Sequence, residues 1–381
     1  MQYSKKQIEK AGFDLVKSDV SKDQNLLAST MNVLTCWRDS HISALDNCEN
    51  LIKNNVKKAD KDSFIAKRIK RTESIIKKLK RFEKMSLKNM QDIAGIRVVL
   101  ANNSKVKQLF YMLCKEESFL INEKIKYKDY IQTPKEDGYR GIHVIGKFKN
   151  DENDLLCVEV QLRTRLQHCW ATSLEIIDLF TQQNLKLNEG KPEWHQFFKF
   201  VSSQFGVIEN LKAFNSNKQT ELVIQYIEFI KKRENISLLK EAIYITNFVS
   251  SKILGTSYTI ETLFQEYATS LHKIESQILN QKNKQGYVLL RLNVLSGNLE
   301  MEIFEKEKYP DASKQYSFYE TTLSQNKNWV VALVSSNAVG GIRQAYPNYF
   351  ADSEVFWSYI TLIKYAAVLG NHSLSSSQKA S

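Results

Sequence analysis

The stretch LLCVEVQLRT, residues 155–164, decides the fold. Leucine and valine recur at every second position, and successive side chains of a β-strand point to opposite faces. One face of this strand is therefore apolar, and the other presents Glu159, Gln161 and Arg163. The alternation predicts a strand that packs one face on a core and displays a polar row on the other.

Two further apolar runs, Ala94–Ala101 and Ile142–Phe148, predict more strands. In the second run His143 and Lys147 fall opposite the apolar residues, which extends the polar face. Helices are expected near residues 103–115 and 164–181. The expected fold class is α+β, with a mixed β-sheet, surrounding helices, a helical linker and a small β-β-α-β-α C-terminal domain.

Positive charge is concentrated between residues 61 and 90. Eleven lysines and arginines and three acidic residues there supply eight of the chain's twelve net positive charges. Apolar residues interleave with them at helical spacing, which predicts a basic helix over 61–83 with one buried side. Such a run is often only a solvated face, but a helix fixed on a core can also hold cations for a polyphosphate.

Changes in periodicity divide the rest of the chain. Residues 123–141 carry the turn formers Pro134, Asp137 and Gly138, which predict a long loop. The expected segments are N-terminal helices (1–60), a sheet-containing domain (61–215), a helical linker (216–284), a C-terminal domain (285–370) and a loose tail (371–381).

The composition excludes several classes of protein. With 43% hydrophobic and 25% charged residues, the chain is not disordered as a whole, and no apolar run is long enough to cross a membrane. Five cysteines without a C-x-x-C pair argue against disulfides and zinc, and neither a P-loop nor a Rossmann glycine motif occurs. The N-terminus lacks a secretory signal, so a cytoplasmic protein is expected.

Two carboxylates point to chemistry. Asp92 stands at the mouth of one expected strand and Glu159 on another, and Mg²⁺ prefers one or two carboxylates together with phosphate oxygens. The basic helix would neutralise phosphates, and Tyr139 could stack on a base. Each feature alone has a plainer explanation, because an Asp before a strand often caps a turn and a polar strand face often meets solvent.

Five motifs follow one another between about residues 65 and 180: QDIAGIR (91–97), KDYI (128–131), PKEDGYRGIH (134–143), VEVQLRT (158–164) and HCWAT (168–172). Together they resemble the RelA/SpoT-type nucleotide pyrophosphokinase domain. The resemblance implies a nucleotidyltransferase-like mixed sheet surrounded by helices. It also implies Mg²⁺-dependent transfer of the β,γ-pyrophosphate of ATP to a ribose 3′-hydroxyl.

The resemblance also implies roles for single residues. Asp92 and Glu159 would hold Mg²⁺, and Glu159 would take the proton of the 3′-hydroxyl. The implied ATP-binding residues are Arg68, Lys70, Ser74, Lys78 and Arg97. The implied acceptor-binding residues are Lys128, Lys135, Tyr139, His143, Gln161 and Arg163, with Tyr139 stacking on the base.

Two absences narrow the branch of the family. The chain has no His-Asp dipeptide, which excludes the metal hydrolase domain of the long bifunctional enzymes, and no long regulatory half follows. The chain therefore resembles the small single-synthetase members. These divide into alarmone synthetases acting on GDP or GTP and toxic members, some of which pyrophosphorylate the 3′-terminal adenosine of tRNA.

The C-terminal segment contains a Y-x-x-Y element formed by Tyr346 and Tyr349. It resembles the fused toxin–antitoxin members of the CapRel type, in which a zinc-finger-like domain without zinc presents such tyrosines to the adenine site. No cysteine follows Cys169, which fits a metal-free version. Tyrosines beside a proline are, however, also common in turns.

Two enzymatic functions stay open. One is a toxic tRNA pyrophosphokinase, inhibited by its own C-terminal domain and released by an outside trigger such as a phage protein. The other is a guanosine alarmone synthetase whose C-terminal domain mediates assembly. The net charge of +12 favours a polyanion such as tRNA, although ATP binding alone accounts for much of it. A third reading, a domain that only binds nucleotide, is disfavoured by the Asp92–Glu159 pair. The sequence leaves the oligomeric state open.

Overall fold

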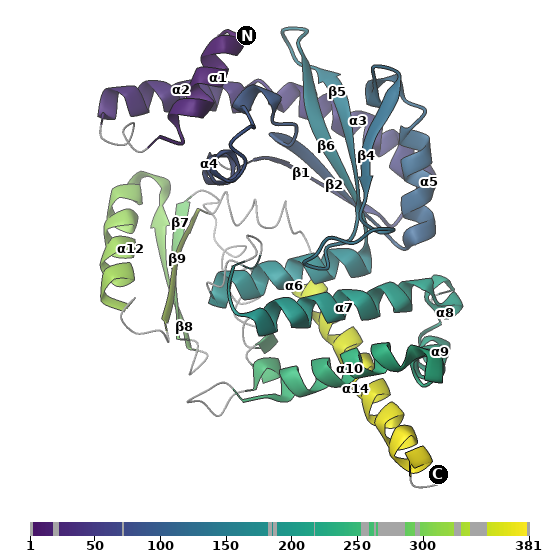
Figure 1. Ribbon diagram of the computed structural model, residues 1–381. Helices are drawn as coiled ribbons and strands as arrows, with labels where there is room; N and C mark the ends of the chain where they lie inside the picture. Colours follow the sequence, from purple (N-terminus) through teal and green to yellow (C-terminus); the bar gives the residue numbers. More distant parts are fainter. Residues whose placement is uncertain are drawn as a thin grey trace. The chain divides into compact units, whose positions relative to one another are not determined.

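The computed structural model describes most of the chain (Figure 1). The described residues are 3–17, 23–70, 72–181, 185, 189–216, 218–252, 259–262, 264–265, 286–293, 298–323, 329–335 and 349–378. The chain divides into two compact units, which are described separately. The first comprises Met1–Thr133 and Arg140–Arg165, and the second comprises Pro134–Tyr139 and Leu166–Ser381. This division differs from the expected boundaries at 215 and 284.

The first unit is built on a six-stranded mixed sheet. Its strands are β1 (Phe64–Ile69), β2 (Ala94–Leu100), β3 (Leu120–Ile121), β4 (Lys124–Asp129), β5 (Ile142–Lys149) and β6 (Leu155–Thr164). Their order is β1-β2-β6-β5-β4-β3, and β2 runs parallel to β6 while the other neighbours are antiparallel. The expected mixed sheet and the three strands expected from apolar runs are confirmed.

Five helices belong to this unit: α1 (Lys5–Asp14), α2 (Gln24–Asp39), α3 (Ile42–Ala59), α4 (Thr72–Arg81) and α5 (Asn103–Leu113). Helices α3 and α5 pack on the sheet at β5 and β6 (Figure 1). The alternate residues Val158, Val160 and Leu162 are fully buried in this core. One face of β6 therefore faces the core, as its alternation predicts, and leaves Glu159 and Gln161 on the other.

Two sequence expectations are wrong in this unit. Residues 64–69 form the strand β1, which pairs along its whole length with β2, so the basic helix is shorter than expected and covers only α4. The apolar residues of this short segment have the spacing of a helix, but backbone hydrogen bonds to the neighbouring strand stabilise the extended conformation more strongly. Part of the expected loop 123–141 is β4, whose alternating sequence KIKYKD has the period of a strand.

Helices dominate the second unit. They are α6 (Arg165–Thr181), α7 (Pro192–Asn210), α8 (Lys212–Asn215), α9 (Gln219–Ile230), α10 (Ile236–Ser250) and α14 (Tyr349–Gln378). Phe197, Phe205 and Phe356 are almost completely buried among them, and α14 packs along α10. The expected loose tail is wrong for residues 371–378, because the packed part of α14 nucleates a helix that continues to Gln378.

The second unit also contains a small antiparallel sheet. Strands β7 (Gly286–Asn293), β8 (Asn298–Glu305) and β9 (Trp329–Ser335) lie in the order β8-β7-β9, with α12 (Tyr309–Leu323) between β8 and β9 in the chain. Leu289, Phe304 and Ala312 form its core. Along the chain the described elements follow the order β7, β8, α12, β9. Tyr346 lies outside the described residues.

Other expectations concern cysteines and membranes. All five cysteines are free thiols. In the part of the chain that the structure describes, no helix has the length and apolar character needed to cross a bilayer.

Candidate functional site

A polar surface runs across four strands of the first unit. The register sets Arg97 of β2 opposite Gln161 of β6, Gln161 opposite His143 of β5, and His143 opposite Lys128 of β4. Directly paired residues point to the same face of a sheet. The structure therefore brings together four of the residues expected to bind ATP or acceptor.

Glu159 lies in the adjacent row of the same face. Its Oε1 is 3.0 Å from Nδ1 of His143, and its Oε2 accepts a 2.6 Å hydrogen bond from Nε2 of Gln161. Nη2 of Arg163 in turn donates to Oε1 of Gln161 at 3.0 Å. The carboxylate is thus held in one orientation by neighbours on its own strand and on β5.

The environment of Glu159 favours its ionised form. Burial alone would raise the pKa of this carboxyl, but the hydrogen bond and charge of His143, the hydrogen bond from Gln161 and the charge of Lys78 together lower it to about 2. A carboxylate that acidic is a good ligand for a hard cation and, in this state, a weak proton acceptor.

Asp92 precedes β2 and forms the second charged centre. Its Oδ2 accepts hydrogen bonds from Nζ of Lys70 and Nζ of Lys78, both at 2.8 Å. Burial would raise the pKa of this carboxyl, but the charge and hydrogen bond of Lys70, followed by those of Lys78, lower it. The carboxylate is therefore ionised and already neutralised by two lysines.

The other oxygen of the same carboxylate fits a metal ion. Oδ1 of Asp92 is buried and has no hydrogen-bond partner among the residues that the structure describes, which is costly for an ionised group. Among the described residues no group of three or more His, Cys, Asp or Glu is placed to hold a metal. A single carboxylate oxygen together with Glu159 suits Mg²⁺, which takes few protein ligands and completes its shell with phosphates and water.

The remaining expected ATP-binding residues come from several elements. Arg68 lies on β1, opposite Gly95, and not on the basic helix, so the register places it on the face that carries Glu159. Ser74 is exposed on α4, and Arg97 is buried on β2. Lys70 follows β1 directly, and its backbone N–H donates to the carbonyl of Ile93 at 2.7 Å, which fixes it beside Asp92.

The expected acceptor-binding residues fall into both compact units. Lys128 and His143 belong to the first, whereas Lys135 and Tyr139 belong to the second. Nζ of Lys135 lies 4.7 Å from the ring centre of Tyr139, a cation–π contact, and only 9% of Tyr139 is exposed. Stacking of this ring on a base therefore stays a prediction that requires the ring to become accessible.

Gly138 shapes the segment that carries these two residues. Its φ of +93° is unfavourable for other residues, and a Cβ there would lie 3.0 Å from Cβ of Ser202 and 3.1 Å from Cα of Lys199. The hydroxyl of Ser202 donates to the carbonyl of Gly138. The segment 134–139 is thereby attached closely to α7.

One aromatic neighbour was missed by the sequence analysis. The ring of Tyr130 meets the ring of His143 edge-on, with centroids 5.2 Å apart. The KDYI motif contains this tyrosine, so the motif itself was the available signal.

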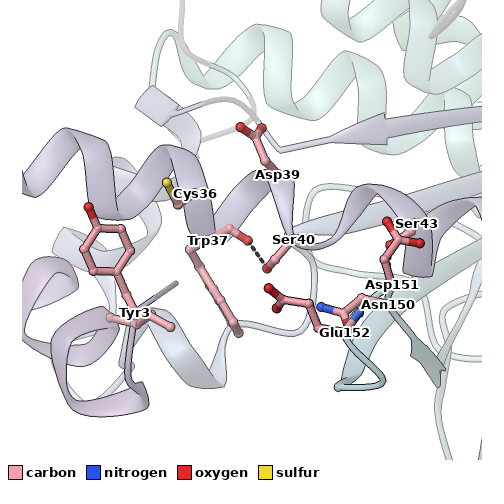
Figure 2. A pocket seen from close by; sticks show the side chains of 10 residues that line it. Tyr3, Cys36, Trp37, Asp39, Ser40, Ser43, Asn150, Asp151 and Glu152 are labelled. Atoms are coloured by element: carbon pink, nitrogen blue, oxygen red, sulfur yellow. Dashed lines mark hydrogen bonds between the residues drawn. The ribbon is translucent and has the colours of Figure 1, made fainter. Parts of the chain in front are cut away.

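A cavity of about 400 Å³ lies elsewhere in the first unit, between the N-terminal helices and the turn after β5 (Figure 2). Its lining includes Tyr3, Trp37, Asp39, Asp151 and Glu152, and the described lining residues include no lysine, arginine or histidine. Three carboxylates repel phosphates. The lining of this cavity is therefore unsuited to bind the phosphates of a nucleotide.

Part of the chain is similar to known proteins. Residues 67–176 match a family model described as a region found in RelA / SpoT proteins. Over 113 residues the chain is 34% identical to the GTP pyrophosphokinase YwaC of Bacillus subtilis, covering 28% of this chain and 52% of that protein. It is 31% identical over 115 residues to the GTP pyrophosphokinase YjbM of the same organism, covering 29% and 53%.

The chain thus spans about half the length of these curated relatives. Among solved structures, small alarmone synthetase 2 of Bacillus subtilis matches with a TM-score of 0.39 and 25% identity, over 48% of this chain and 96% of that one. The matched region 67–176 contains Asp92, Glu159 and all the acceptor-binding residues expected from the sequence. The candidate site lies within the part of the chain that matches this family model.

Proposed function

We propose that the protein is an ATP-dependent pyrophosphokinase that transfers the β,γ-pyrophosphate of ATP to a ribose 3′-hydroxyl. The arrangement at Asp92 carries this proposal, because two lysines and a buried, unpartnered carboxylate oxygen stand together at the edge of the polar face. Lysines bind phosphates and a carboxylate oxygen binds Mg²⁺, and phosphoryl-type transfer needs both. The match of residues 67–176 supports the same reaction class.

Each side chain has a defined task in this reaction. Lys70 and Lys78 leave Asp92 for the phosphates of ATP, and Asp92 together with Glu159 holds Mg²⁺. The metal supplies charge neutralisation of the transferred pyrophosphate. Arg68, Ser74 and Arg97 bind ATP from β1, α4 and β2, and Arg97 lies in the row of Gln161 and His143.

Glu159 also accepts the proton of the attacking 3′-hydroxyl. Its pKa of about 2 reflects the contacts of the ligand-free site, chiefly those with His143 and Gln161. An acceptor that takes over these two partners raises the basicity of the carboxylate at the moment when a proton must be removed. His143 and Gln161 thus both bind the acceptor and control the base.

For the acceptor we propose the 3′-terminal adenosine of tRNA, so that the enzyme blocks translation. The net charge of +12 supports a large polyanion. In this proposal Tyr346 and Tyr349 inhibit the synthetase until a trigger such as a phage protein releases them. The second candidate is a guanosine nucleotide, which the names of the relatives YwaC and YjbM favour.

One experiment separates these candidates. Purified protein is incubated with Mg²⁺ and ATP labelled on the γ-phosphate, together with GDP, GTP or deacylated tRNA, and label in each acceptor is quantified. Label in tRNA that is lost when its 3′-terminal ribose is oxidised with periodate supports the first acceptor. Label only in GDP or GTP supports the second. Label in none of them, with both the wild-type protein and the variant Tyr346→Ala/Tyr349→Ala, contradicts the pyrophosphokinase proposal.

A further inference from the structure

Five lysines extend the polar face beyond Glu159. Lys124, Lys126 and Lys128 alternate along β4, and Lys147 and Lys149 alternate along β5. We call this set the lysine strip. All five are exposed, and within the described part of the chain none of them makes an ion pair. The strip is thus a concentrated positive surface that the proposed ATP site does not use.

The strand register fixes the strip relative to the candidate site. Lys128 pairs with His143, and Lys126 pairs with Ile145, which itself pairs with Glu159. Lys126 therefore lies on the face of Glu159, two strands or about 10 Å away. The ATP-binding lysines approach from β1 and α4, on the other side of β6, so the strip occupies the side that ATP leaves open.

Lys147 continues this surface by one further row. It pairs with Cys157 of β6, two residues before Glu159. Lys126 pairs with Ile145, which stands two residues before Lys147 on β5. Both lysines therefore lie on the face of Glu159, in neighbouring rows.

Protection of a sheet edge does not explain the whole strip. Lysines on an exposed edge strand prevent pairing with other chains, and β4 lies near one edge of the sheet. Lys147 and Lys149 lie beyond Ile145, where the pairing of β5 with β4 ends. Lys147 nevertheless pairs with Cys157 of β6, so its side chain stands on the face that carries Glu159 and not in the plane of the sheet edge. Alternate residues along a strand are about 7 Å apart, so the three lysines of β4 span about 14 Å. A single nucleotide does not need a track of that length.

We propose that the lysine strip binds the backbone phosphates of a single-stranded RNA whose 3′ end enters the site, so that the acceptor is a nucleic acid strand and not a free nucleotide. Grooves that bind single strands combine a positively charged track along the backbone with aromatic side chains on which bases stack, and the lysine strip supplies the first of these. This inference rests on the proposed pyrophosphokinase function, because only that reaction makes the bound 3′ end the acceptor of pyrophosphate. The binding itself is measured without any transfer.

The test is the salt dependence of RNA binding. Binding of deacylated tRNA, without ATP, is measured between 50 and 300 mM KCl for the wild-type protein and for the double variant Lys126→Gln/Lys147→Gln. Each lost phosphate contact lowers the slope of log K against log salt by about 0.7 for single strands. We expect a slope smaller by about 1.4 and an ATP affinity within about twofold of the wild type.

The matched control is Lys107→Gln/Lys115→Gln. These exposed lysines lie on and just after α5, which packs on the opposite face of the sheet, and their loss changes the net charge equally. An unchanged slope in the strip variant, or an equal loss in the control, overturns the proposal. So does an equal loss of GDP affinity in the strip variant, because it assigns the lysines to a mononucleotide. If no pyrophosphate is transferred to any acceptor, the proposed function fails while the slope still decides whether the strip binds RNA.

Discussion

Lys78 and Asp92 form an ion pair, with Nζ of the lysine 2.8 Å from Oδ2 of the carboxylate, while Oδ1 of the same carboxylate is buried without a partner. In the ligand-free protein, Lys78 and Lys70 neutralise the charge that a divalent cation would neutralise. If ATP binds here as proposed, its phosphates would attract the lysines away from the carboxylate, and a metal ion would then face less repulsion. We therefore expect nucleotide and metal binding to be positively coupled.

Replacement of Lys78 tests this coupling. In Lys78→Gln we expect ATP affinity to fall at least tenfold, because a hydrogen bond to a charged group contributes roughly 1.5–3 kcal/mol. In the same variant the affinity for Mn²⁺ without nucleotide should rise several-fold, since one competing cation is gone. Isothermal titration measures the affinity for ATP, and the EPR signal of free Mn²⁺ measures the affinity for Mn²⁺.

Lys77→Gln is the matched control, because Lys77 is the neighbouring exposed lysine on α4 and makes no ion pair with Asp92. It should leave both affinities nearly unchanged. A Mn²⁺ affinity that falls in Lys78→Gln contradicts the exchange of partners at Asp92.

Glu159→Gln tests the chemistry. It removes a metal ligand and the proton acceptor together, while the amide keeps the size of the side chain on β6. We expect turnover to fall by about 10²–10⁴-fold, the range for a general base, while the variant still folds at neutral pH. Retention of more than about a tenth of wild-type turnover assigns the proton to another group.

The low pKa of Glu159 predicts how its stabilising effect depends on pH. Its folded pKa of about 2 lies below the ordinary value of 4.5. Such a group stabilises the fold fully above its unfolded pKa, and the contribution is lost as the pH falls through the folded pKa. The difference in unfolding free energy between wild type and Glu159→Gln, from urea denaturation, should therefore shrink between pH 6 and pH 3. A constant difference contradicts the pairing of Glu159 with His143.

Tyr139→Ala tests the acceptor side. Stacking on a base contributes roughly 1–3 kcal/mol, so acceptor affinity should fall about 5- to 150-fold, while ATP affinity stays nearly unchanged. Isothermal titration with each ligand separates the two effects. An equal loss of ATP affinity places Tyr139 on the ATP side. Tyr139→Phe, which keeps the ring, is the control.

Much of the site could be predicted because a strand with one buried face shows a regular alternation of apolar and polar residues in the sequence. The period of two in β6 identified both its buried face and the polar row of Glu159, Gln161 and Arg163. The same reasoning failed for β1, since six residues with mixed apolar and basic side chains fit a helix as well as a strand. Only pairing with β2 decides between them, and that contact is distant in sequence.

The assignment of Lys135 and Tyr139 shows a second limit. The motif PKEDGYRGIH is continuous in sequence, but its first six residues belong to one compact unit and its last four to the other. The positive φ of Gly138 and its close approach to Ser202 attach the first part to α7. A linear motif carries no information about such a division, which depends on the packing of a helix more than fifty residues further along the chain.

The last prediction concerns inhibition by the C-terminal segment. Tyrosines are large, stiff at low entropic cost and able to fill an adenine site by stacking, and Pro347 stands between the two in the sequence. A tether gives such a segment an effective concentration near millimolar, so a weak contact keeps most molecules closed. A trigger then needs to favour the open state by only a few kcal/mol.

Tyr346→Ala/Tyr349→Ala should therefore be toxic to the expressing cells without any trigger, and addition of Glu159→Gln should abolish the toxicity. Tyr365→Ala, at an exposed tyrosine of α14, is the control and should leave growth unchanged. If the double-alanine protein permits normal growth while its purified form transfers pyrophosphate, the tyrosines do not inhibit, and the C-terminal segment is then better explained as an assembly or acceptor-binding module.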